Sequence, residues 1–112
     1  MHLFELIAES HARSRRKGFY ENGERNIPEM LCLIHSEVSE ALEDFRDGKM
    51  LTEFSGISSG TMSKPEGFPT ELADIIIRVC DLAGYLDIDL EKEIKLKSNY
   101  NETRPYKHGR KI

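Results

Sequence analysis

The chain has 112 residues, a formal net charge of −4 and 38% hydrophobic residues. This length predicts one domain, residues 1–112, whose single core is small enough to favour oligomerisation. The negative charge argues against a general binder of nucleic acid polymers, and no run approaches the ~20 apolar residues of a membrane span. Cys32 and Cys80 each lie in an apolar helical run without a preceding signal peptide, so we expect a cytoplasmic protein with reduced thiols.

Two amphipathic helices are expected in the first half of the chain. The first begins at Leu3, continues toward Arg16 and is closed by Gly18. The second carries Pro28 in its first turn and ends at Asp47-Gly48, positions that suit proline and glycine in a helix. Its apolar stripe comprises Met30, Leu31, Ile34, Val38, Ala41, Leu42 and Phe45.

A long irregular segment, residues 47–69, separates the second helix from the third. Compact domains rarely contain such a segment without a purpose, and a lid, an arm toward a partner subunit and a disordered linker all fit its composition. Apolar residues within it favour a partly ordered segment over a free linker. These expected anchors are Leu51, Phe54, Ile57, Met62 and Phe68.

The second half of the chain predicts two more helices. Thr70 is expected to cap a third helix that runs from Glu71 to about Leu86, and Asp89 a fourth that ends near Arg104-Pro105. Because no strand pattern is evident, we expect an all-α four-helix bundle with a long loop between helices two and three. The third helix is so apolar that we expect burial almost all round, except along one polar stripe, which comprises Glu71, Asp74, Arg78, Asp81 and Tyr85.

Two acidic motifs, Glu37/Glu40 and Glu71/Asp74, each place carboxylates three residues apart on a predicted helix. Residues at this spacing share one side of a helix, so facing helices would gather four carboxylates. Such a cluster repels itself unless a divalent cation neutralises it, and Mg²⁺ or Mn²⁺ prefers oxygen ligands. The ordinary alternative is a solvated acidic face, or for Asp74 an ion pair with Arg78 four residues later. Together the two motifs favour the metal site.

The segments that carry these motifs resemble a known family. Residues 34–43 (IHSEVSEALE) and 65–76 (PEGFPTELADII) are similar to the MazG-like all-α nucleoside triphosphate pyrophosphohydrolases, a superfamily that includes dimeric dUTPases, dCTP pyrophosphatases and phosphoribosyl-ATP pyrophosphohydrolase. The resemblance implies a Mg²⁺-dependent cytoplasmic hydrolase that cleaves a nucleotide between its α- and β-phosphates. It also implies a homodimer or a dimer of dimers, with nucleotide-pool house-cleaning as a role that fits this activity. It implies catalytic metal ligands at Glu37, Glu40, Glu71 and Asp74. Residues 97–109 resemble the closing motif, which implies substrate contacts from Lys97, Asn101 and Arg104.

One position departs from the family pattern. The family's first motif usually has two adjacent glutamates, whereas here Ser36 stands at the first of them. A hydroxyl is a weaker cation ligand than a carboxylate, so the number of metal ions and the general base stay open. The base and sugar of the nucleotide also stay open, with an alarmone among the alternatives. The rival from another class is a non-catalytic helical interaction module that kept the fold.

Overall fold

The computed structural model describes residues 1–55 and 63–111, and its helices follow the periodicity of the sequence. The described residues contain four α-helices, as predicted, so the helical class of the fold is confirmed. A two-stranded sheet and a 3₁₀ turn were not predicted. The elements are α1 (Leu3–Arg16), α2 (Ile27–Arg46), β1 (Glu53–Ser55), β2 (Lys64–Glu66), α3 (Phe68–Tyr85), α4 (Leu90–Glu102) and η1 (Tyr106–Gly109).

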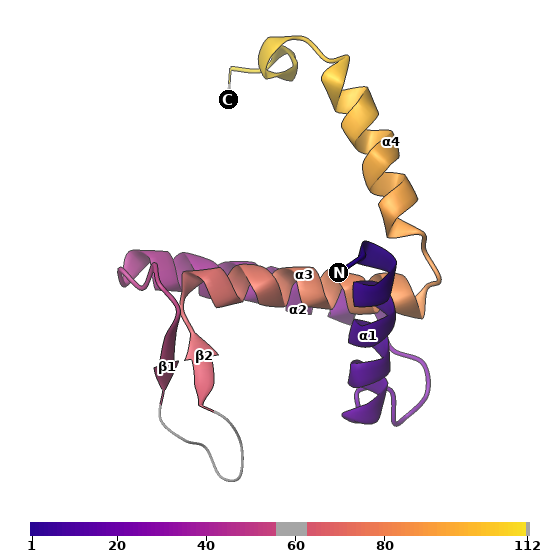
Figure 1. Cartoon of the computed structure of the whole chain (residues 1–112), viewed down its shortest axis with the longest axis vertical. Coiled ribbons are helices and arrows are strands. Elements are labelled where there is room, and N and C mark those ends of the chain that lie inside the picture. The colour runs from indigo at the N-terminus through magenta and orange to yellow at the C-terminus, as the bar shows by residue number, and fades with distance from the viewer. Residues whose placement is uncertain (56–62, 112) are drawn as a thin grey trace.

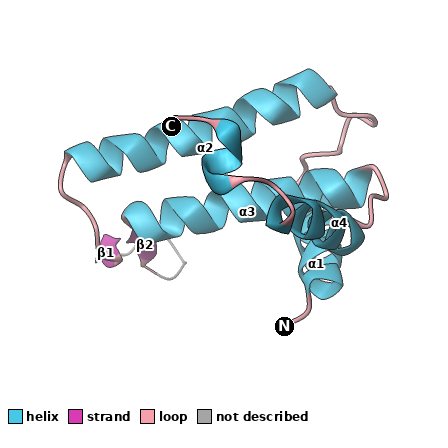
Figure 2. Cartoon of the chain, turned by 90° about the horizontal axis from the view of Figure 1, so that it is seen from above, coloured by secondary structure: helices cyan, strands magenta, loops and turns pink. Residues whose placement is uncertain are grey.

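Helices α2 and α3 lie side by side, and α1 crosses α3 near its C-terminal end (Figure 1, Figure 2). The crossing is close because Gly84 has no side chain. A Cβ atom at Gly84 would lie 2.7 Å from the Cβ of His11 on α1. Few apolar side chains are buried among the described residues, and they lie on α2 and α3. These are Met30, Ala41, Cys80 and Ala83.

The predicted starts of α1, α2 and α4 are confirmed, and α2 and α4 each begin with a capping contact. The side chain of Asn26 accepts a hydrogen bond from the Glu29 N–H (2.9 Å) at the start of α2, and Asp89 accepts one from Lys92 at the start of α4. The prediction that Thr70 caps α3 is wrong. The helix begins at Phe68, because proline in a first helical turn is well tolerated, and the Thr70 hydroxyl instead donates to the Gly67 carbonyl (2.8 Å).

The segment between α2 and α3 contains an antiparallel hairpin in which Glu53 pairs with Glu66. It projects from the end of the α2–α3 pair that lies far from α1 (Figure 1). The expected anchors Leu51 and Phe54 are 75% and 66% exposed, so the prediction that they pack is wrong for the single chain. Ile57 and Met62 lie outside the described residues.

The α2–α3 pair has one face that is apolar and uncovered within the chain. Val38 and Leu42 of α2 and Leu72 and Ile76 of α3 are each about half exposed. The prediction that α3 is buried almost all round is therefore wrong for a single copy. Helix α4 also has no buried residue; it packs mainly against α1 and projects away from the α2–α3 pair (Figure 1). Among the described helices, none combines the length and hydropathy needed to cross a lipid bilayer.

Candidate metal centre and the adjoining cleft

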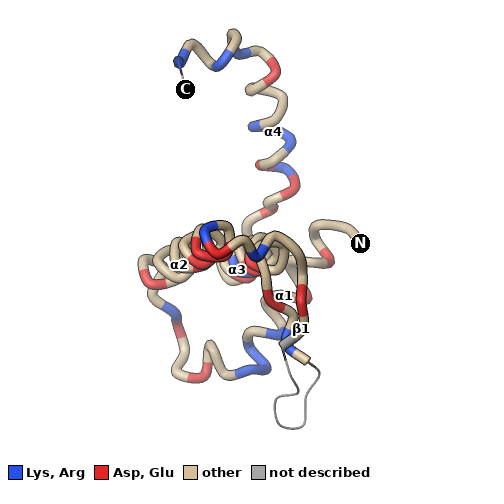
Figure 3. The backbone as a smooth tube through the Cα atoms, turned by 90° about the vertical axis from the view of Figure 1, so that its left-hand side faces the viewer, with Lys and Arg blue, Asp and Glu red and all other residues tan. Residues whose placement is uncertain are grey.

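Three carboxylates meet across the interface between α2 and α3. Glu37 lies in the middle of α2, and Glu71 and Asp74 lie in the first two turns of α3. Each offers an oxygen, and these oxygens lie within 4.8 Å of one another. The packing of α2 on α3 thus joins residues more than thirty positions apart. We call Glu37, Glu71 and Asp74 the carboxylate cluster; the acidic residues of both helices are red in Figure 3.

Glu40 lies beside the carboxylate cluster rather than among its closest oxygens. It is one turn after Glu37 on α2 and is exposed. Burial, followed by the negative charge of Glu40 and by hydrogen bonding with Glu37 and Glu40, raises the pKa of Glu71 from 4.5 to about 7. The structure therefore brings all four predicted acidic residues within electrostatic reach of one another, with Glu40 at the edge.

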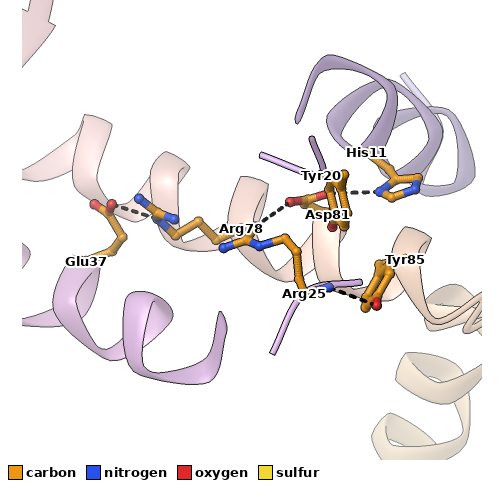
Figure 4. A network of polar contacts seen from close by, with 7 residues as sticks. All are labelled: His11, Tyr20, Arg25, Glu37, Arg78, Asp81 and Tyr85. Atoms are coloured by element: carbon orange, nitrogen blue, oxygen red, sulfur yellow. Dashed lines mark hydrogen bonds and ion pairs between the residues drawn. The ribbon is translucent and has the colours of Figure 1, made fainter. Parts of the chain in front are cut away.

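Arg78 is the counter-ion of the carboxylate cluster. Its Nε donates to Oε1 of Glu37 at 2.8 Å, one turn beyond Asp74 on α3 (Figure 4). Burial raises the pKa of Glu37, but the hydrogen bond from Arg78 and its charge outweigh burial, so the pKa lies below its ordinary value. Burial and then the charge of Glu37 raise the pKa of Asp74, which Arg78 opposes. Arg78 thus forms its ion pair with Glu37, and not with Asp74 as the alternative expected.

Two oxygens of the carboxylate cluster are buried without a hydrogen-bond partner among the described residues. They are Oε2 of Glu37 and Oε2 of Glu71. An unpaired buried carboxylate oxygen loses its hydration with no compensation, which native structures avoid. A hard divalent cation is the ligand that such oxygens prefer, because it supplies charge without needing a hydrogen bond. The residues present therefore fit a Mg²⁺ or Mn²⁺ ion.

Ser36, the position that departs from the family pattern, does not point its hydroxyl to the carboxylate cluster. The hydroxyl donates to the backbone carbonyl of Leu33, one turn earlier in α2, at 2.6 Å. A serine that bonds to its own helix in this way has its hydroxyl held at the helix backbone. Among the described residues, the side chains at this site that could hold a cation are accordingly those of Glu37, Glu71 and Asp74, with Glu40 beside them.

A cleft of about 290 Å³ adjoins the carboxylate cluster. This cleft was not predicted from the sequence. Two helical stripes face each other across it, one from α1 and one from α3, each with the spacing i, i+3, i+4, i+7. The loop after α1 and Glu37 of α2 complete the lining. The α1 stripe is Ser10, Arg13, Ser14 and Lys17; the α3 stripe is Asp74, Ile77, Arg78 and Asp81; the remainder is Phe19, Arg25 and Glu37.

Asp81 fixes the far wall of this cleft. Although 8% exposed, it accepts hydrogen bonds from Tyr20 (3.0 Å) and His11 (3.0 Å to Nδ1) and pairs with Arg25 at 3.7 Å (Figure 4). Burial and then the bond to Asp81 raise the pKa of Tyr20 to about 12. The backbone N–H of Arg25 also donates to the Tyr85 hydroxyl. The polar stripe predicted on α3 is thus real, and its second half ties α1 and the following loop to α3.

The C-terminal residues implied by the resemblance lie elsewhere in the single chain. Lys97 and Arg104 each stack on the Tyr100 ring, with distances of 5.2 and 5.7 Å to its centroid. Asn101 is exposed on the same helix. None of these residues lines the cleft beside the carboxylate cluster, because α4 projects away from the α2–α3 pair (Figure 1). The structure brings Lys97 and Arg104 together around Tyr100 but not to the carboxylates.

The chain was compared with protein-family models, with curated proteins and with solved structures, and no match was found in any of the three.

Proposed function

We propose that this chain is a Mg²⁺-dependent nucleoside triphosphate pyrophosphohydrolase of the MazG-like all-α type. In this reaction a water oxygen bonds to the α-phosphorus while the bond to the α–β bridging oxygen breaks, and pyrophosphate leaves. The observation that carries the proposal is the pair of buried oxygens without partners, one from Glu37 and one from Glu71, beside Asp74. The likeness of residues 34–43 and 65–76 to the family motifs supports the same activity.

The four acidic residues Glu37, Glu40, Glu71 and Asp74 would hold the cation. A divalent ion bound there would neutralise phosphate oxygens and lower the pKa of an attacking water. The chain itself orients this ligand set: Arg78 holds one Glu37 oxygen, and the other is buried without a hydrogen-bond partner among the described residues. Without the cation, the negative cluster would repel a polyphosphate, so substrate affinity depends on the metal.

We also propose that the working form is a homodimer or a dimer of dimers. The half-exposed apolar residues Val38, Leu42, Leu72 and Ile76 share one uncovered face, and a second copy offers the same face. Exposed apolar area of this kind marks an interaction surface on a soluble chain. Helix α4 supports the same conclusion, because an isolated helix of 13 residues is marginal in water and needs a surface to cover it.

The proposal is tested by incubating the purified protein with Mg²⁺ and a broad panel of nucleotides, alarmones included, and measuring pyrophosphate. We expect release from at least one nucleotide and a loss of at least about a hundredfold in Asp74→Asn, because ligand loss exceeds the effect of losing an outer-shell partner. Glu43→Gln is the matched control: it removes an exposed carboxylate of α2 that pairs only with Arg46 at 3.3 Å. Its activity should equal that of the wild type.

The rival, a non-catalytic helical interaction module, makes a different prediction. A scaffold has no reason to bind Mg²⁺, so its melting temperature should not depend on the ion. Folded wild-type protein that releases no pyrophosphate from any nucleotide, and that millimolar Mg²⁺ does not stabilise, would overturn the proposed function in favour of the rival.

A further inference from the structure

The cleft between α1 and α3 contains two cationic side chains that have no partner within residues 1–55 and 63–111. Of its charged residues, Arg78 pairs with Glu37 and Arg25 pairs with Asp81. The charged residues of the lining that remain are Arg13 and Lys17, both exposed at the end of α1, and one carboxylate, Asp74. Among the described residues, neither side chain takes part in a hydrogen bond or an ion pair. The cleft therefore has an unmatched positive charge, and a cation held by the carboxylate cluster would increase it.

The lining of the same cleft includes a buried hydroxyl group that has no hydrogen-bond partner among the described residues. Ser10 is 2% exposed, and its Oγ finds no hydrogen-bond partner among the described residues. A hydroxyl can both donate and accept, so leaving it dry and unpaired is unfavourable unless a ligand completes it. Ser14 is one turn away on the same stripe and adds a second hydroxyl to the wall. Two cations and two hydroxyls on one helical stripe match the oxygens of a phosphate group.

We propose that the α1 stripe, Ser10, Arg13, Ser14 and Lys17, binds the phosphate chain of the ligand next to the carboxylate cluster. The chemical class is a diphosphate or longer polyphosphate, free or attached to a nucleoside. Arg13 forks onto phosphate oxygens, Lys17 adds a second charge, and the hydroxyls of Ser10 and Ser14 accept or donate at the remaining positions. This inference deepens the proposed function and rests on it for the identity of the reacting nucleotide, but the binding site is testable alone.

The ordinary explanation of these cations is favourable interaction with the C-terminal end of the α1 dipole. That explanation applies equally to Arg16, which is in the same last turn but does not line the cleft. Arg16→Gln is therefore the matched control for Arg13→Gln and Lys17→Gln. All three variants remove one exposed positive charge from α1, so they should fold alike, and circular dichroism checks that they do.

The test measures inorganic pyrophosphate binding by calorimetry in the presence of Mg²⁺. Each lost charge-assisted bond should weaken binding at least about tenfold in Arg13→Gln and Lys17→Gln, whereas Arg16→Gln should change the dissociation constant less than about twofold. Ser10→Ala should weaken binding without lowering the melting temperature of the ligand-free protein, because the hydroxyl has no partner to lose. A ligand-free protein that Ser10→Ala destabilises would contradict the role given to this hydroxyl.

Two further arms separate this inference from the alternatives. Lys92→Gln and Lys95→Gln on α4 should bind pyrophosphate like the wild type, because both residues are exposed and neither lines the cleft. The dissociation constants of pyrophosphate, a nucleoside triphosphate and a nucleoside monophosphate show whether the site prefers free or nucleoside-linked phosphate. The monophosphate should bind weakest. Equal losses in Arg13→Gln and Arg16→Gln, losses confined to the α4 variants, or a wild type that does not bind pyrophosphate would each overturn the inference.

The outcome does not depend on the outcome for the proposed function. If the protein binds pyrophosphate through Arg13 and Lys17 but hydrolyses no nucleotide, the α1 binding site is supported and the proposed enzymatic activity is refuted. If both substitutions leave nucleotide hydrolysis and its Michaelis constants unchanged, the proposed enzymatic activity is supported and the α1 binding site is refuted.

Discussion

Replacing Glu71 with glutamine should stabilise the metal-free protein and weaken its stabilisation by Mg²⁺. In the metal-free state the pKa of Glu71 is raised from 4.5 to about 7, so the folded protein holds a proton that the unfolded chain has lost between these pH values. Stability from this group is therefore lost as pH rises through that window, and the full penalty is present above pH 7. Glutamine keeps the shape and carries no charge.

The size of this effect follows from the displacement of the pKa. A rise from 4.5 to about 7, at about 1.4 kcal/mol for each pH unit, corresponds to about 3 kcal/mol of penalty at pH 8. Because Glu71 is only half-buried, solvent screening reduces the expected gain of Glu71→Gln to about 2 kcal/mol. At pH 4 the variant and the wild type should have nearly equal stability, since wild-type Glu71 is then protonated in both states.

The assay is urea denaturation of metal-free protein at pH 4 and pH 8, repeated at pH 8 with Mg²⁺. With the ion, the wild type should gain stability and the variant should gain much less, because one ligand is missing. Glu9→Gln on the exposed side of α1 is the control for loss of a carboxylate. A Glu71→Gln variant that is less stable than the wild type at pH 8 without metal, or equally stabilised by Mg²⁺, would refute this reasoning.

Three further substitutions test the packing around the site. Arg78→Met should destabilise the protein by about 2 kcal/mol at pH 8, because it leaves Glu37 buried and unpaired, and adding Glu37→Gln should restore most of the loss. Tyr20→Phe should cost about 1 kcal/mol and remove the tyrosine that ionises near pH 12 from an ultraviolet titration. Gly67→Ala should destabilise α3 by more than about 2 kcal/mol in urea, since φ is 122° and the new Cβ meets the Leu51 carbonyl.

Each of these predictions has an outcome that contradicts it. For the ion pair, it is a double variant no more stable than Arg78→Met alone. For the tyrosine, it is an unchanged alkaline titration, which would mean that the hydroxyl is not held by Asp81. For the glycine, it is a denaturation midpoint equal to that of the wild type, which would mean that the chain relaxes around the new methyl group at no measurable free-energy cost.

The helices were predictable because a helix that is buried on one side has apolar residues at a helical period in its sequence. The apolar stripe of α2 and the cap residue of α4 sufficed to place both helices within a few residues. The hairpin was not predictable in the same way, since strands of three residues are too short to show alternation. The start of α3 was misplaced because Thr70 was interpreted as its cap, whereas the helix begins at Phe68 and has Pro69 in its first turn.

The candidate site was only partly predictable. The spacing of Glu71 and Asp74 placed both on the polar stripe of α3, and the structure puts them opposite Glu37. The partner of Arg78 was not predictable, because Glu37 is 41 positions away and Asp74 is the local alternative. The α1 stripe was present at the spacing i, i+3, i+4, i+7, but a basic helix end usually signifies only the dipole. Which cations face a cleft depends on how α1 crosses α3.

Anomalous diffraction from crystals grown with Mn²⁺ tests the central claim most directly. The account predicts a metal peak between α2 and α3, with oxygens of Glu37, Glu71 and Asp74 at coordination distances and Glu40 beside them. A peak bound only by residues outside this set, or crystals soaked in Mn²⁺ in which these oxygens contact only Arg78 and water, would contradict it.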